Sequence, residues 1–141
     1  MTETRQPDSG LRALDRLVGT WKLSGGVTGT STYRWADGGF FLLQESELEH
    51  EGDRHRSLEV IGRERPFGAE ESSAEIKART YTDTGDTLDY VYELDRDTLT
   101  IWGGEIGSPA YFRGRFTDGG DTIVGGWVWP GGGYDVTITR A

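Results

Sequence analysis

Apolar and polar residues alternate with a period of two along most of the chain. Between positions 88 and 94, for example, Leu or Tyr occupies every second position, and Asp, Val or Glu lies between them. This alternation predicts β-strands with one buried face, because successive side chains of a strand point to opposite sides. The segments with strand character are residues 20–23, 30–35, 40–50, 54–62, 73–82, 87–95, 98–103, 110–117, 122–129 and 134–140.

Short segments rich in Gly and Asp separate these predicted strands. Both residues favour tight turns, because they tolerate the backbone angles that such turns require. The clearest examples are residues 37–39, 51–53, 83–86, 95–97, 118–121 and 130–133. Strands joined by short turns pair with their neighbours in sequence, and a closed barrel leaves no exposed sheet edge. We therefore predict an all-β fold, a single antiparallel up-and-down β-barrel of about ten strands.

Only the beginning of the chain has the spacing of a helix. Leu11, Leu14 and Leu17 recur every three residues, and Ser9 is a suitable N-cap. We expect a short helix here that acts as a lid or plug. The first ten residues are polar and lack the apolar stretch found in signal peptides and membrane spans. The sequence thus predicts a flexible segment over residues 1–10, one barrel domain over residues 11–141, and a cytoplasmic location.

The alternation also assigns an interior face to each predicted strand. In residues 54–62 we expect Leu58 and Val60 to be buried, with Ile61 as a further candidate. Aromatic residues, which include 5 Trp and 6 Tyr, recur on the interior faces of the other strands. Trp and Tyr suit the wall of a cavity because they offer a flat apolar face and one hydrogen bond. The alternative is that these side chains form a filled core. We predict a ligand-binding cavity lined by Tyr33, Trp35, Tyr90, Tyr92, Trp102, Phe112, Trp127, Trp129 and Tyr134.

The strand over residues 40–50 has two interpretations. If Glu45 and Glu47 point inward, a carboxyl there has a raised pKa or an Arg partner and acts as an acid, a base or an anchor for a polar ligand group. If Phe40, Leu42 and Leu48 point inward instead, both glutamates lie in water. We favour the second interpretation because Glu side chains are rarely buried.

The composition is acidic, with 15 Lys and Arg against 24 Asp and Glu in 141 residues and a formal net charge of -9. Such a surface does not favour nucleic acids or anionic membranes, which attract Lys and Arg. The absence of Cys excludes disulfides, thiolate nucleophiles and Cys-based metal sites. His50 and His55 flank an acidic turn, but their spacing matches no metal motif. We expect no metal site and no nucleic-acid or membrane partner, and we assign no catalytic residue.

Three segments carry a resemblance to a known superfamily. Residues 17–21 read Leu-Val-Gly-Thr-Trp, residues 33–40 end in Asp-Gly-Gly-Phe, and residues 118–127 run from Asp-Gly-Gly-Asp to Gly-Gly-Trp. They resemble the calycins, in which lipocalins, fatty-acid-binding proteins and nitrobindins begin with a G-x-W element. The closest resemblance, over residues 14–140, is to small bacterial lipocalin-like proteins. It implies a ten-stranded barrel with the ligand inside.

The resemblance also bears on cofactors. Nitrobindin-like members bind haem through a histidine late in the chain. The only histidines of this sequence are His50 and His55, and its last predicted strand has none. We therefore expect no cofactor.

Two functions fit these observations. The first is an intracellular carrier or sequestering protein for a small apolar or aromatic molecule. The second is a cyclase or isomerase for a polyketide-like or other natural-product substrate, whose catalysis depends on positioning more than on a sequence motif. A third possibility is a homodimer that packs through the apolar outer residues Val124 and Val128.

Overall fold

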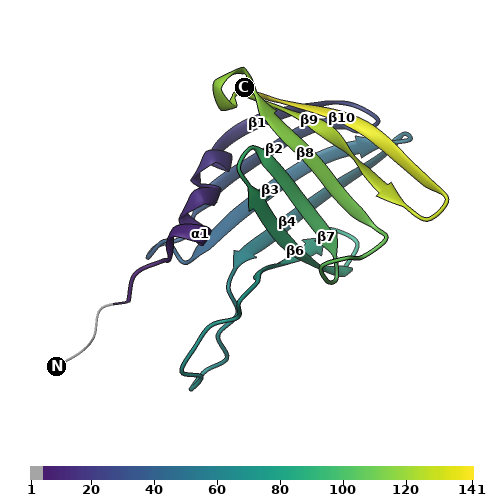
Figure 1. Ribbon diagram of the computed structural model, residues 1–141. Coiled ribbons are helices and arrows are strands. Elements are labelled where there is room, and N and C mark those ends of the chain that lie inside the picture. The colour runs from purple at the N-terminus through teal and green to yellow at the C-terminus, as the bar shows by residue number, and fades with distance from the viewer. Residues whose placement is uncertain (1–4) are drawn as a thin grey trace.

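Ten antiparallel strands close into a barrel in the computed structural model, which describes residues 5–141 (Figure 1). Each strand pairs with its neighbours in sequence, and β1 closes the barrel by pairing with both β2 and β10. The predicted fold class is confirmed. The strands are β1 (Gly19–Gly25), β2 (Thr28–Trp35), β3 (Phe41–His50), β4 (Asp53–Gly62), β5 (Ile76–Thr82), β6 (Thr87–Asp95), β7 (Thr98–Gly103), β8 (Tyr111–Thr117), β9 (Thr122–Trp129) and β10 (Gly132–Arg140).

Glycine is required at particular points of this barrel. Gly38 and Gly39, between β2 and β3, have φ angles of 94° and 76°, which L-residues with a side chain rarely adopt. At Gly125 in β9 an added Cβ would lie 2.1 Å from the Arg113 carbonyl oxygen of β8. The Gly-rich composition therefore serves tight turns and close strand packing.

A short helix covers one end of the barrel (Figure 1). It comprises α1 (Ser9–Arg12) and a 3-10 helix, η1 (Ala13–Leu17), and its three leucines are buried. A second 3-10 turn, η2 (Asp118–Gly120), joins β8 to β9. Neither helical segment within residues 5–141 has the length and apolarity of a membrane-spanning helix.

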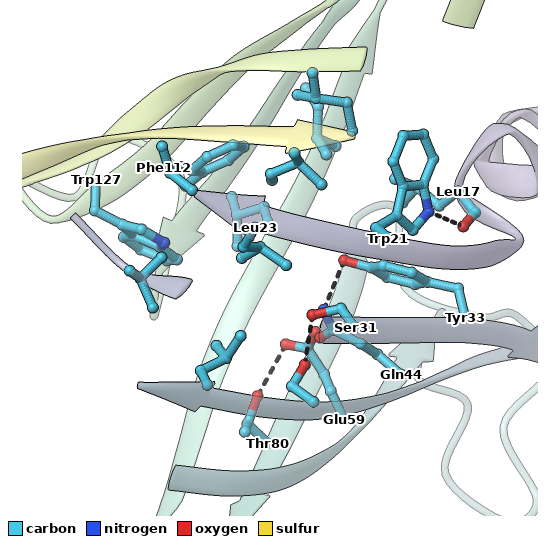
Figure 2. A pocket seen from close by; sticks show the side chains of 18 of the residues that line it. Leu17, Trp21, Leu23, Ser31, Tyr33, Gln44, Glu59, Thr80, Phe112 and Trp127 are labelled. Atoms are coloured by element: carbon cyan, nitrogen blue, oxygen red, sulfur yellow. Dashed lines mark hydrogen bonds between the residues drawn. The ribbon is translucent and has the colours of Figure 1, made fainter. Parts of the chain in front are cut away.

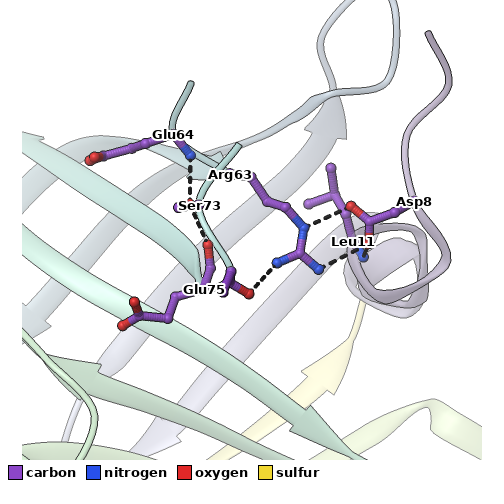
Figure 3. Close-up of polar contacts among 7 residues, drawn as sticks. Asp8, Leu11, Arg63, Glu64, Ser73 and Glu75 are labelled. Carbon is purple, nitrogen blue, oxygen red and sulfur yellow. Dashed lines mark hydrogen bonds and ion pairs between the residues drawn. The ribbon is translucent and has the colours of Figure 1, made fainter. Parts of the chain in front are cut away.

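Asp8, rather than Ser9, caps this helix. Its Oδ1 accepts a hydrogen bond from the Leu11 backbone N–H at 3.0 Å. Its carboxylate also accepts two hydrogen bonds from the Arg63 guanidinium, at 2.7 and 2.9 Å (Figure 3). Part of the segment predicted to be flexible, residues 1–10, is therefore fastened to the loop after β4, and residues 1–4 of that segment lie outside the described part of the chain.

The pleat phase of β4 differs from the sequence prediction. Leu58 is 38% exposed and Val60 is on the same outer face, whereas Glu59 is only 4% exposed and Ile61 is fully buried. The prediction that Leu58 and Val60 are buried is therefore wrong, and Ile61 is the apolar residue that faces the core. The pairing with β3 sets this phase, because Ile61 lies opposite the buried Leu42.

On β3 the favoured interpretation is confirmed for the two leucines and the two glutamates, whereas Phe40 precedes the strand and is only partly buried. Leu42 is buried and Leu48 packs against the core, so that Glu45 and Glu47 occupy the outer face. Glu47 lies 3.3 Å from the exposed guanidinium of Arg56. Neither of these glutamates is available to a ligand inside the barrel.

The outer face of β9 carries the residues that suggested self-association. Val124 and Val128 are 50% and 45% exposed there. The structure holds one chain, so the homodimer stays a prediction.

Candidate functional site

The interior of the barrel contains a cavity of about 180 Å³. Leu17 of η1 and Trp21 of β1 line its helix-covered end, where the Trp21 indole N–H donates to the Leu17 carbonyl oxygen at 2.8 Å. Val27, in the turn after β1, lines the opposite end. An apolar cavity of about 150 Å³ holds benzene, so this space suits a molecule of one or two rings.

One wall of the cavity, which we call the polar wall, is built by β2, β3, β4 and β5. Tyr33, Gln44, Glu59 and Thr80 lie side by side in register across these four strands. The Gln44 amide donates to the Tyr33 hydroxyl at 2.7 Å, and the Thr80 hydroxyl donates to Glu59 Oε2 at 2.9 Å (Figure 2). Polar side chains at interior positions of four adjacent strands thus form one row, which consists of two hydrogen-bonded pairs.

A second polar row runs beside the first. Ser31, Ser46 and Ser57 lie opposite one another on β2, β3 and β4, and all three line the cavity. The Ser31 and Ser46 hydroxyls share a hydrogen bond of 2.9 Å (Figure 2). The polar wall therefore offers hydroxyl, amide and carboxyl groups.

The opposite wall, which we call the apolar wall, is built by β6 to β10 together with Leu23 of β1. Two aromatic pairs organise it: the ring centroids of Phe112 and Trp127 are 5.8 Å apart, as are those of Tyr90 and Trp127. Phe112 and Trp127 lie across the space from the polar row in Figure 2. The aliphatic members of this wall are Leu99, Ile101, Ile123, Val136 and Ile138.

Glu59 is the point at which the two walls are joined. Its Oε1 accepts a hydrogen bond of 2.5 Å from the hydroxyl of Tyr92, which comes from β6. Burial raises the pKa of the Glu59 carboxyl, because removal from water disfavours the charged form. The hydrogen bonds from Tyr92 and Thr80 favour the carboxylate and act in the opposite direction, but burial has the larger effect.

The surrounding tyrosines are held in their neutral form. Burial, and then the charge of Glu59, raises the pKa of Tyr90 to about 12 and the pKa values of Tyr33 and Tyr92 further. Burial alone raises the pKa of Tyr134. Their hydroxyl groups are therefore hydrogen-bond donors at neutral pH, and Glu59 is the acidic group of the cavity.

Most of the aromatic residues predicted from the sequence lie together around this cavity. Those that line it are Tyr33, Tyr90, Tyr92, Phe112, Trp127 and Tyr134. They come from β2, β6, β8, β9 and β10, so that segments far apart in sequence contribute to one space. Whether they bind a ligand stays a prediction.

The other three predicted residues lie elsewhere. Trp35 shares the interior face of Tyr33 but is two residues nearer the helix-covered end, where its indole N–H donates to Asp15 at 2.8 Å. Trp102 is on the outer face of β7, because its neighbour Ile101 takes the interior position. Trp129 is 39% exposed at the last position of β9, away from the helix-covered end of the barrel.

Sequence reasoning missed the polar wall apart from Tyr33. On β3, Gln44 and Ser46 lie between Leu42 and Leu48 at intervals of two residues, so that all four share one face. The inward orientation of the two leucines therefore implied that Gln44 and Ser46 also face the cavity. For Glu59 the signal was Ile61, which is two residues further on and therefore shares its face. On β4 the apolar outer residues Leu58 and Val60 concealed this signal.

The two histidines lie at the far end of the β3–β4 hairpin. His50 Nδ1 is 2.8 Å from the Gly26 carbonyl oxygen, and its ring centroid is 4.9 Å from that of Tyr134. His55 is exposed on β4. Among residues 5–141 no group of three His, Cys, Asp or Glu side chains is arranged to hold a metal ion.

A closed ten-stranded barrel preceded by a short helix fits a calycin-like fold. The functional argument rests on the cavity, with its carboxyl group between a polar and an apolar wall. No protein-family model and no curated protein matches this sequence.

Proposed function

We propose that this chain is a lipocalin-like protein of the bacterial cytoplasm that holds one small, largely apolar molecule inside its barrel. The observation that carries the proposal is the division of the cavity into an apolar wall, rich in aromatic rings, and a polar wall. Ligand sites in proteins commonly combine apolar surface with a few polar groups that fix orientation. The cavity has this composition.

The dimensions narrow the class of ligand. A volume of about 180 Å³ is below the roughly 300–1,000 Å³ of sites for drug-sized molecules. A flat ring can pack against Phe112, Trp127 and Tyr90, whose own rings contact one another in tilted pairs at 52° and 59°. The polar end of such a molecule then meets Gln44 and Glu59.

A second function is favoured by one specific observation, the buried carboxyl of Glu59. A carboxyl group with a raised pKa that faces a bound molecule is suited to general acid–base catalysis. An isomerase or cyclase that moves a proton on a small cyclic substrate would use Glu59 in this way. The two functions differ in whether the molecule leaves the barrel unchanged.

The test of binding compares two Trp→Phe variants. Ligand-observed NMR and calorimetry with 2-naphthol measure the affinity of the wild-type chain, and native mass spectrometry of the freshly purified protein detects any molecule that accompanies it. We expect Trp127→Phe to weaken 2-naphthol binding by roughly three- to tenfold, or about 0.7–1.4 kcal/mol. Trp102→Phe is the matched control on the outer face and should have no effect.

Three outcomes decide between the functions. Equal affinities of both variants and the wild type would contradict a site inside the barrel. Recovery of the bound molecule unchanged after prolonged incubation supports a carrier. Chemical conversion of the bound molecule that is lost in the Glu59→Gln variant but retained in the Trp102→Phe variant supports an enzyme.

A further inference from the structure

Among residues 5–141, Glu59 is the only formally charged side chain that lines the cavity. The lining contains no Lys, Arg or His that would neutralise it. Arg63 and Arg79, for example, pair with the carboxylates of Asp8 and Asp89 outside the barrel. A buried carboxylate without a basic partner is an uncompensated negative charge inside the cavity.

The hydrogen bonds of Glu59 leave room for a further donor. The two oxygens of a carboxylate offer about four acceptor positions. Tyr92 uses one on Oε1 and Thr80 uses one on Oε2, at 2.5 and 2.9 Å. A ligand with N–H donors therefore finds acceptor capacity at the middle of the polar wall.

The apolar wall also favours a ligand that carries a positively charged N–H group. The faces of Tyr, Trp and Phe rings attract cations, more strongly when water is excluded. Tyr90, Trp127 and Phe112 present several such rings to the cavity. An ammonium group in this cavity would be attracted by the Glu59 carboxylate on one wall and by the faces of these rings on the other.

Building on the binding function proposed above, we infer that the ligand is a small organic cation, a protonated amine attached to one or two rings, whose ammonium group pairs with Glu59. Its ring system lies against Phe112 and Trp127. Carboxylate ligands are disfavoured, since a second negative charge would face Glu59 with no basic group to offset it. The ligand class is thus opposite in charge to a fatty acid.

Proton exchange gives this pairing a distinct signature. The titratable groups that face Glu59 are Tyr33 on β2 and Tyr90 and Tyr92 on β6. Tyr134 and His50 lie further away, toward the end of the barrel opposite the helix. Burial raises the pKa of Glu59, so that the carboxyl group of the free protein keeps its proton to a higher pH than an exposed glutamate does. Binding of an ammonium ion favours the carboxylate, and the displaced proton goes to the buffer.

The experiment uses three probes of similar size and different charge. Phenethylamine, 2-phenylethanol and 3-phenylpropanoate are titrated calorimetrically into the wild-type chain, the Glu59→Gln variant and the Glu45→Gln variant. Glu45→Gln makes the same chemical change on the outer face of β3 and is the matched control. We expect the wild type and Glu45→Gln to bind the amine at least tenfold more tightly than the alcohol, with the carboxylate weakest, and Glu59→Gln to lose this preference.

The outcomes separate this inference from the function on which it rests. Equal binding of amine and alcohol by the wild type, or tightest binding of the carboxylate, overturns the cationic ligand but leaves a binding cavity. No binding of any probe contradicts both. Titrations of the wild type with phenethylamine in buffers of different ionisation enthalpy need no variant. Proton release that rises as the pH falls toward the pKa of Glu59 supports the pairing, and its absence overturns it.

Discussion

The two walls of the cavity are both built from antiparallel strands, but their interior side chains differ in polarity. On the apolar wall, β6 to β10 point apolar and aromatic residues such as Tyr90 and Phe112 into the cavity. On the polar wall, β4 places Glu59 inside and exposes Leu58. The comparison teaches that hydrophobic alternation identifies a strand without fixing which face is buried. Pairing with neighbouring strands fixes it, because register determines which side chains share a face.

Energetically, the walls should also differ. The apolar wall is stabilised by burial and dispersion, which scale with contact area. The polar wall is stabilised by hydrogen bonds whose net contributions are smaller, and it contains a carboxyl group whose burial is unfavourable. We therefore expect the apolar wall to supply stability and the polar wall to supply selectivity.

The largest effect is expected from truncation on the apolar wall. Phe112 is buried and contacts Trp127, so that Phe112→Ala should lower the free energy of unfolding by about 3–5 kcal/mol. Gln44→Ala on the polar wall removes the donor to Tyr33 and should lower it by about 1–3 kcal/mol. Urea denaturation followed by circular dichroism measures both. Equal losses would contradict the energetic division between the walls.

The same division describes what the sequence predicted. The barrel and its ten strands followed from alternation and turn residues, and so did the interior positions of Tyr90 and Phe112, because polar residues mark the outer faces of β6 and β8. Both faces of β9 are largely apolar, so that alternation alone did not distinguish the face of Trp127. Glu59 was not predicted, because Leu58 and Val60 give the outer face of β4 the stronger apolar pattern. Its burial depends on partners from β5 and β6, and such tertiary contacts have no local sequence signal.

A smaller effect, and one specific to the polar wall, concerns pH. The pKa of Glu59 is higher in the folded chain than in the unfolded chain. Below the unfolded value both states are protonated, and the group has no effect on stability. As pH rises between the two pKa values the unfolded state releases its proton first, so that stability falls by up to about 1.4 kcal/mol per pH unit.

Glu59→Gln isolates this contribution. We expect the stability of the variant relative to the wild type to increase with pH from the ordinary carboxyl range upward and then to level off above the folded pKa. Denaturation curves at a series of pH values measure it. Asp8 acts in the opposite direction, since the Arg63 hydrogen bonds lower its pKa and its contribution is lost as pH falls, but it is present in both proteins and cancels. A difference that is independent of pH would mean that Glu59 has an ordinary pKa in the fold.

The smallest effect is expected in the serine row, where it tests whether the polar wall acts as a network. Ser31→Ala or Ser46→Ala leaves the other hydroxyl without its 2.9 Å partner inside the barrel, and each should lower the free energy of unfolding by about 1 kcal/mol. The double variant removes donor and acceptor together, so that no hydroxyl of the pair remains unsatisfied. We therefore expect it to be little less stable than either single variant, with a coupling of about 0.5–1 kcal/mol in the double-mutant cycle. Additive losses would mean that each hydroxyl bonds to water or ligand instead of to its neighbour. The two serines would then be independent contacts for a bound molecule, and the polar wall would act as separate groups held in register by the strands.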